Sequence, residues 1–237
     1  MDDTLTIERR YRGPEGSGNG GYTCGIVAAF VAGDAEVTLR VPPPLETPLR
    51  VERDADGHVR VLDGETLVAE ARPAVLEVHP SEPVSFALAA ERSAAQPDDP
   101  RHPFPTCFVC GPARERGDGL RLKPAPAGDD RLAAAWTPTE EQAGRPELVW
   151  AALDCPGAFA VDPQLERGVS VLGRLHARVV DTPVAGEPCV VVAWPLAQDE
   201  GRKRFAGTAV FGESGRLLGL ARATWILIEP RDPTSAP

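Results

Sequence analysis

Asp154 is the residue whose position in this sequence most strongly suggests a chemical role. It lies inside an otherwise apolar stretch, residues 149–160 (VWAALDCPGAFA). A carboxylate in such surroundings usually serves a purpose, because burying a charge is costly. A structural alternative stays open. Pro156 removes an intrahelical hydrogen bond and should kink or break the helix near Cys155, so Asp154 could simply bond to the freed backbone groups.

The cysteines form a second group of chemically capable side chains. Cys107 and Cys110, together with His102, suggest a zinc site, but a structural zinc needs four ligands and the sequence has no second C-x-x-C. Cys155 or Cys189 could complete a set only from a distant part of the chain. We therefore expect a packed, turn-forming cysteine pair and no bound metal, with all five thiols reduced because their odd number and irregular spacing do not fit a disulfide framework.

Two basic clusters could bind phosphate groups, since arginine suits that geometry. One is the run Arg202, Lys203 and Arg204. The other cluster consists of Arg114, Arg116, Arg121 and Lys123. The alternative for each cluster is an ordinary solvated loop.

Composition excludes several classes of protein. The 237 residues include 25 Lys and Arg against 35 Asp and Glu, a net charge of −10, so a nucleic-acid or anionic-membrane partner is not expected. No apolar run reaches the roughly 18 residues of a membrane span, and the chain opens with Met1-Asp2-Asp3 rather than a secretory signal. We expect a cytoplasmic protein. The motifs G-x-S-x-G and G-x-x-x-x-G-K are absent, so serine-hydrolase and nucleotide-binding chemistry are unsupported.

The elements that would position these residues follow one order twice: a strand, a buried helix, and an antiparallel meander of strands. Many prolines and glycines and two Asp-Gly turns favour short strands in hairpins. The proline-rich segment 91–105 is predicted to be a linker. Helices are predicted at 22–32 and 146–161. Strands are predicted at 4–8, 35–41, 48–53, 59–62, 66–72, 120–122, 131–136, 169–180, 188–196, 204–211 and 217–228.

Two short motifs carry a resemblance to a known superfamily. Cys107-Phe108-Val109-Cys110-Gly111, followed by Gly119-Leu120, resembles the C-F-x-C-G…G-L segment of many hotdog-fold thioesterases. Asn19-Gly20-Gly21-Tyr22 is similar to the N-G-G-Y opening of that superfamily's central helix. The resemblance implies an α+β fold, a tandem (double) hotdog in which each half is an antiparallel sheet wrapped around a central helix. The expected halves are residues 1–97 and 98–237, with their two sheets joined edge to edge.

The resemblance also implies roles for particular residues. The superfamily's acid lies about nine residues after the His or Asn of the helix opening, and Asp154 stands nine after Arg145. Backbone N–H groups of Gly20 and Gly21 would hold the oxyanion formed from a thioester carbonyl. Residues expected to bind substrate are Asn19 and Tyr22 at the pocket mouth, the second acid Glu147, and Arg202, Lys203 and Arg204 for coenzyme A phosphates. For Glu147 the alternative is a favourable charge on the helix dipole.

Neither half matches the superfamily's pattern completely. The first helix has Ala28 in the place of the acid, and the second opens with Arg145-Pro146, where proline has no N–H to offer. One interpretation is a composite site that hydrolyses an acyl-CoA or related acyl thioester, with Asp154 as base or nucleophile and an amide-to-carboxylate separation of about 6 to 8 Å. The other is a non-catalytic protein that binds acyl groups or acyl-CoA. A dehydratase is disfavoured, because Phe159 replaces the expected histidine. No cofactor is expected beyond coenzyme A as part of the substrate, and homo-oligomers of such chains are compatible with this arrangement.

Overall fold

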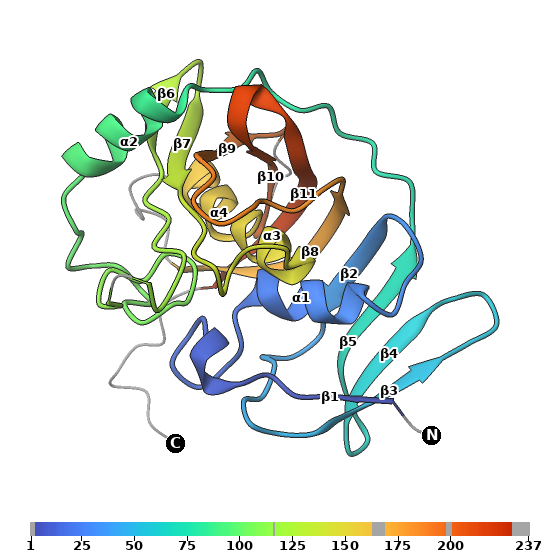
Figure 1. Ribbon diagram of the computed structural model, residues 1–237. Helices are drawn as coiled ribbons and strands as arrows, with labels where there is room; N and C mark the ends of the chain where they lie inside the picture. The colour runs from blue at the N-terminus through green and yellow to red at the C-terminus, as the bar shows by residue number, and fades with distance from the viewer. Residues whose placement is uncertain (1–2, 116, 163–168, 198–200, 229–237) are drawn as a thin grey trace.

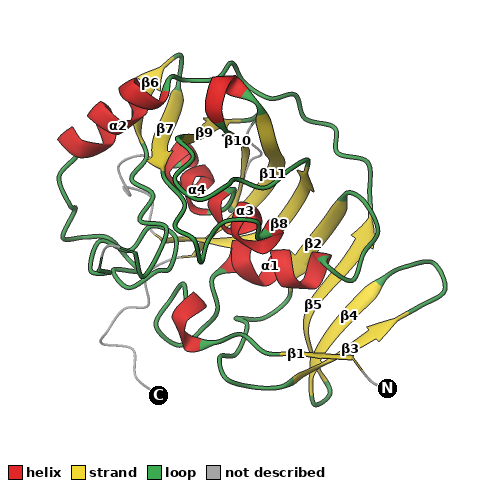
Figure 2. Ribbon diagram, viewed as in Figure 1, coloured by secondary structure: helices red, strands yellow, loops and turns green. Residues whose placement is uncertain are grey.

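The computed structural model describes residues 3–115, 117–162, 169–197 and 201–228. Their main feature is an 11-stranded antiparallel sheet with the order β1-β3-β4-β5-β2-β8-β11-β10-β9-β7-β6, which curves around the helices α1, α3 and α4 (Figures 1 and 2). The strands are β1 (Asp3–Leu5), β2 (Ala35–Leu39), β3 (Leu49–Arg53), β4 (Val59–Asp63), β5 (Thr66–Pro73), β6 (Ala125–Gly128), β7 (Arg131–Trp136), β8 (Val169–Val179), β9 (Cys189–Pro195), β10 (Lys203–Phe211) and β11 (Leu217–Ile228). The helices are α1 (Gly20–Ala28), α2 (Phe86–Ala95), α3 (Pro146–Ala152) and α4 (Cys155–Val161), with short 3-10 turns η1 (Arg9–Tyr11) and η2 (Glu213–Gly215).

The strand order repeats within the sheet. The first five strands lie in the order β1-β3-β4-β5-β2, and five later strands lie in the corresponding order β7-β9-β10-β11-β8. In both sets a helical segment separates the first strand in sequence from the second. The two sets meet where β2 pairs antiparallel with β8, from Ala35 opposite Ala177 to Thr38 opposite Arg174. Because β8 begins at Val169, its first residues extend beyond this ladder.

Helix α1 begins at a strong capping residue and packs closely against α3. The Asn19 side chain accepts a hydrogen bond from the Tyr22 N–H at 2.8 Å, which satisfies one of the free amides of the first turn. Glycine is required on the face of α1 that meets α3. A Cβ placed on Gly25 would lie 2.7 Å from the Glu147 Cα and 2.8 Å from the Trp150 Cβ. The sequence therefore brings the two helices to backbone contact at the centre of the fold.

The predicted break of the second central helix is confirmed. A single stretch from 146 to 161 becomes α3 and α4, because Pro156 cannot donate to the preceding turn. The carbonyl of Leu153 accepts a hydrogen bond from the buried Thr208 hydroxyl at 2.7 Å. Asp154 lies at this break, with φ −84° and ψ −90° outside the helical region. The break turns Asp154 into the residue that precedes α4.

The prediction for the segment between the two sets of strands was partly wrong. Helix α2 occupies the start of the predicted linker, capped by Ser85, whose hydroxyl accepts from the Leu88 N–H at 3.3 Å. Its buried Ala89 and half-buried Phe86 pack on the sheet face opposite the central helices, against side chains that include Val190.

The predicted strand at 120–122 was also wrong, and β6 was not predicted. Leu120 and Leu122 instead donate their N–H groups to the carbonyls of Phe108 and Val109, at 2.9 and 2.8 Å. The remaining predicted strands are observed, with ends shifted by a few residues. In the part of the chain that the structure describes, no helix has the length and apolar character needed to cross a membrane.

Candidate functional site

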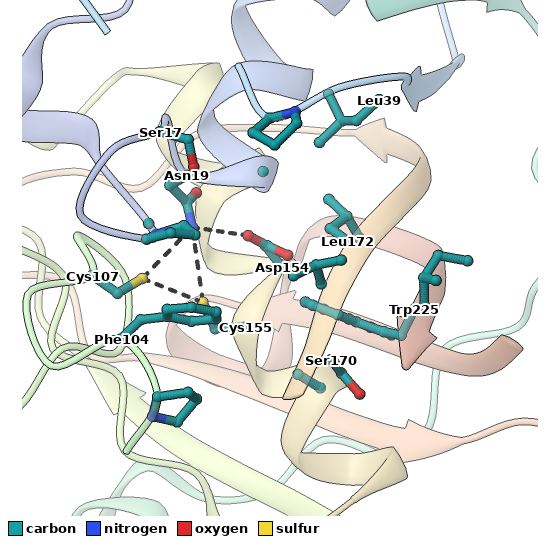
Figure 3. A pocket seen from close by; sticks show the side chains of 18 of the residues that line it. Ser17, Asn19, Leu39, Phe104, Cys107, Asp154, Cys155, Ser170, Leu172 and Trp225 are labelled. Carbon is teal, nitrogen blue, oxygen red and sulfur yellow. Dashed lines mark hydrogen bonds between the residues drawn. The ribbon is translucent and has the colours of Figure 1, made fainter. Parts of the chain in front are cut away.

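A cavity of about 740 Å³ opens where β2 and β8 separate. One wall comes from residues 39–43, at the end of β2 and just after it, and the facing wall from residues 170–173, which precede the β2–β8 ladder. The start of α1, the start of α4 and the cysteine loop at 107–110 close its inner end (Figure 3). Most of the lining is apolar, including Leu39, Phe104, Ala158, Phe159, Leu172 and Trp225. The cavity could therefore enclose a hydrocarbon or aromatic group.

Asp154 lines the cavity and is bound to the first turn of α1. Its side chain is buried, with 2% exposure, and its Oδ2 accepts hydrogen bonds from the Asn19 Nδ2 at 2.9 Å and from the Gly21 N–H at 2.8 Å. The other oxygen, Oδ1, is buried and has no partner among the described residues. The carboxylate is thus held by one oxygen, while the second remains able to accept a proton.

Asn19 links the helix cap to this carboxylate. Its Oδ1 accepts from the Tyr22 N–H, so its Nδ2 must be the end that donates to Asp154, as Figure 3 shows. The same Nδ2 lies 3.8 Å from the sulfur atoms of Cys107 and Cys155. Asn19 therefore has a positioning role that the sequence interpretation, which placed it only at the pocket mouth, did not include.

Burial raises the pKa of Asp154 from 3.8 to about 7. Desolvation is the largest cause, and the hydrogen bond from Gly21 opposes it. The charge of Cys107 raises the pKa further, while the hydrogen bond from Asn19 lowers it. A carboxylate with this pKa exists in both protonation states near neutral pH, which suits general acid–base chemistry.

The two glycines predicted to hold an oxyanion lie in different positions relative to the carboxylate. The Gly21 N–H is bound to Asp154, so it positions the acid, and the 2.8 Å separation is shorter than the 6 to 8 Å expected. Gly20 lines the cavity, and its N–H has no partner among the described residues. A side chain would not fit there, since a Cβ on Gly20 would lie 2.9 Å from the Leu172 side chain.

Three further polar atoms of the cavity were not predicted to contact a substrate, although His102 was considered as a zinc ligand. The Ser170 Oγ, the Trp225 Nε1 and the His102 Nε2 are buried, belong to lining residues, and have no partner among the described residues. Their positions depend on the separation of β2 from β8 and on the loop that follows α2, neither of which has a local sequence signal. These groups could hydrogen-bond to a polar part of a ligand.

Several predicted substrate-binding residues do not line the cavity. Tyr22 is buried and stacked on Tyr11, with ring centroids 3.9 Å apart. Glu147 pairs with Arg145 at 2.7 Å, near the start of α3. Neither residue lines the cavity, and the place of Glu147 in the first turn of α3 fits the alternative of a favourable charge on the helix dipole.

The basic run lies beside the cavity rim rather than in its lining. The Arg202 carbonyl accepts from the Leu227 N–H at 2.8 Å, and Ile226 and Ile228 on either side of Leu227 line the cavity. In the other basic cluster, Arg114 is buried and pairs with Asp118, and Lys123 pairs with Asp98. Arg116 lies outside the described residues.

The cysteine loop meets the start of α4 at the inner end of the cavity. The sulfur atoms of Cys107, Cys110 and Cys155 all lie within 4.8 Å of one another, and the Cys107 and Cys155 sulfurs are 3.7 Å apart. Cys189 and Cys24 are buried elsewhere. Of the two cysteines that the sequence offered as distant partners for the Cys107–Cys110 pair, the fold thus brings in Cys155.

Comparison with known proteins identifies the fold. No protein-family model and no curated protein matches the sequence. A proposed thioesterase from Novosphingobium aromaticivorans aligns over 95% of this chain and 94% of its own, with 12% identity and a TM-score of 0.63. The tesB protein of Mycobacterium avium subspecies paratuberculosis aligns over 95% and 92%, with 14% identity and a TM-score of 0.60. A hot dog fold protein of unknown function from Alicyclobacillus acidocaldarius aligns over 96% and 93%, with 13% identity and a TM-score of 0.60. The chain therefore has the hotdog fold that its motifs predicted.

Proposed function

We propose that this protein hydrolyses acyl thioesters at a composite site in which α1 supplies the amide donors and the α3–α4 break supplies the acid. The observation that carries the proposal is the bond between Asp154 and the start of α1, beside a largely apolar cavity. We also propose that the chain is a tandem hotdog with halves 1–97 and 98–237. The repeated strand order supports this, as does the end of α2 at Ala95.

The chemistry follows from the free atoms of the site. The acyl group occupies the cavity with its carbonyl oxygen near the Gly20 N–H, which stabilises the oxyanion together with the partial positive charge of the helix start. A water molecule attacks the carbonyl carbon, and its proton passes to the Asp154 Oδ1. The carbon–sulfur bond then breaks, and Asp154 returns the proton to the leaving thiolate. The products are a carboxylic acid and a free thiol.

The test is turnover of a panel of acyl thioesters by the wild type and by Asp154→Asn. Loss of a general base should reduce kcat by about 10²- to 10⁴-fold. Asp34→Asn is the matched control, because Asp34 pairs with Arg178 on the surface and does not line the cavity. Equal rates in the wild type and Asp154→Asn would remove Asp154 from the mechanism.

We propose coenzyme A as the thiol carrier, recognised by Arg202, Lys203 and Arg204. Their position beside the cavity rim supports this assignment. Replacing all three with glutamine should raise KM for acyl-CoA severalfold, while KM for the same acyl group on N-acetylcysteamine, which lacks phosphates, stays constant. An equal change for both substrates would argue against phosphate recognition by this run.

A non-catalytic acyl-binding protein is the second candidate. The hydrogen bond from the Gly21 N–H to Asp154 favours this candidate. Of the two amides expected to hold an oxyanion, only the Gly20 N–H is then left to do so. Removing a single oxyanion donor costs enzymes about 10²- to 10³-fold in kcat. Tight binding of a thioester, measured by calorimetry, with no release of thiol over hours would select this candidate over hydrolysis.

A further inference from the structure

The cysteine cluster forms a group that the proposed hydrolysis does not use. Cys107 and Cys110 come from the loop before β6, and Cys155 is the first residue of α4. Cys107 and Cys155 are buried, Cys110 is half-buried, and all three line the cavity. Three thiols from two distant segments of the chain converge at one point, within 4.8 Å of one another.

The spacing of these sulfurs matches the ligand shell of a soft metal ion. A tetrahedral zinc with Zn–S bonds of about 2.3 Å separates its sulfur ligands by about 3.8 Å. The Cys107 and Cys155 sulfurs are already 3.7 Å apart. The Cys110 sulfur lies within 4.8 Å of both, so the three sulfurs are near the spacing that one metal ion requires.

The loop that carries Cys107 and Cys110 is held in a tight turn. The Gly111 N–H donates to the Cys107 carbonyl at 2.9 Å and closes a tight turn. A Cβ on Gly111 would lie 2.5 Å from the Cys107 backbone nitrogen, so only glycine fits. The turn therefore holds Cys107 and Cys110 together beside Cys155.

We propose that Cys107, Cys110 and Cys155 bind one zinc ion, with the fourth coordination position facing the cavity. Three protein ligands with one open position is the arrangement of zinc sites that accept water or a ligand, whereas closed structural sites have four. The sequence interpretation set zinc aside because a further ligand was missing from the local motif. The fold supplies Cys155 for this purpose. The inference concerns ligands different from those of the proposed hydrolysis and does not depend on it.

The test measures metal binding directly. Full-length protein purified without chelator should contain about one zinc per chain by mass spectrometry of the metal. After removal of the metal under reducing conditions, titration with Co²⁺ alone should give sulfur-to-cobalt charge-transfer absorption and the visible bands of a tetrahedral site, saturating at one equivalent.

A matched pair of variants locates the site. Cys110→Ser should weaken Co²⁺ binding by about 100-fold or more, since loss of even an outer-shell contact costs 10- to 100-fold. Cys189→Ala removes a buried cysteine outside the cluster and should bind as the wild type does. Unchanged Co²⁺ binding in Cys110→Ser would overturn the proposal. If that variant does not fold, the wild type decides: no charge-transfer band with all five thiols reduced refutes the site.

Discussion

Replacing Asp154 with asparagine should make the protein more stable relative to the wild type as the pH rises, while reducing the rate of hydrolysis. In the unfolded chain the Asp154 carboxyl has a pKa of 3.8, and in the folded protein burial raises its pKa to about 7. Between these values the native state holds a proton that the unfolded state has released. The contribution of Asp154 to the free energy of unfolding therefore falls with pH across this interval and levels off above pH 7.

The magnitude follows from the two pKa values. They differ by about 3, and each pH unit between them changes the free energy of unfolding by about 1.4 kcal/mol, which gives about 4 kcal/mol in all. The asparagine variant does not titrate. Its Oδ1 can accept from Asn19 and Gly21 as the aspartate Oδ2 does, while its amide N–H groups take the unpartnered position. That mismatch costs about 1 to 3 kcal/mol at every pH, so it offsets the curve without altering its shape.

The assay is urea denaturation of both proteins from pH 4 to pH 9, after treatment with EDTA so that no cation at the neighbouring cysteines affects the carboxylate. The stability of Asp154→Asn minus that of the wild type should rise by about 4 kcal/mol up to pH 7 and then stay constant. Asp34→Asn provides a control of opposite sign. The hydrogen bond from Arg178 holds the pKa of Asp34 below its usual value of 3.8, so this variant should be less stable than the wild type by a nearly constant amount from pH 4 to pH 9, and its deficit should shrink only when the series is extended below pH 3.8. A difference curve for Asp154 that is flat from pH 5 to 9 would refute the reasoning.

Three further substitutions test the packing and the cavity. Gly25→Ala gains about 1 kcal/mol of helix propensity, but its Cβ forces apart the α1–α3 contact, so urea denaturation should show a net loss of stability of about 1 to 3 kcal/mol. Gly16→Ala is the control and should leave stability unchanged, because the space around Gly16 is open. Thr208→Val leaves the buried Leu153 carbonyl without its hydroxyl partner and should cost about 1 to 3 kcal/mol, with an unchanged denaturant slope. Trp225→Phe removes the unpartnered indole N–H of the cavity wall. It should weaken binding of acyl groups that carry an oxygen acceptor by about fivefold and leave binding of saturated acyl groups unchanged, as measured by KM or by calorimetry. Equal losses for both kinds of acyl group would mean that only the shape of the ring matters.

Local patterns predicted most of the sheet and the broken helix. Alternating residues around the turns at Asp56-Gly57 and Asp63-Gly64 predicted the hairpins, and Pro156 predicted the break, because hairpin turns and helix interruption depend on a few adjacent residues. Helix α2 was not predicted, because its second half falls in the segment 91–105, whose four prolines, all of them after the helix, favoured a linker. The strand expected at Leu120 failed for another reason. Its backbone pairs with the cysteine loop, a long-range contact that alternation cannot reveal.

The sequence predicted which residues form the site, but not which of their atoms bond to one another. Asp154 and the start of α1 were paired by analogy, and the structure places them in contact. What no local pattern could supply is which atoms remain free after the contact forms. The carboxylate accepts from one of the two amides expected to hold the oxyanion, that of Gly21, and of these two glycines Gly20 lines the cavity. Asn19 becomes the residue that orients the acid.

The close packing of α1 against α3 also limits which residues can occupy the start of α1. Gly21 must lack a side chain because a Cβ there would lie 2.4 Å from the Asp154 Cβ and 2.7 Å from the Trp150 carbonyl oxygen. A glycine at this position therefore serves packing and acid positioning at once. The buried acid is costly to the fold above pH 7, whereas the hydrogen bonds from Gly21 and Asn19 recover part of that cost and keep Oδ1 free. A protein that only needed to pack these helices would gain stability from an uncharged residue in place of the carboxylate, so the presence of the carboxylate at the cavity wall supports the proposed proton-transfer role.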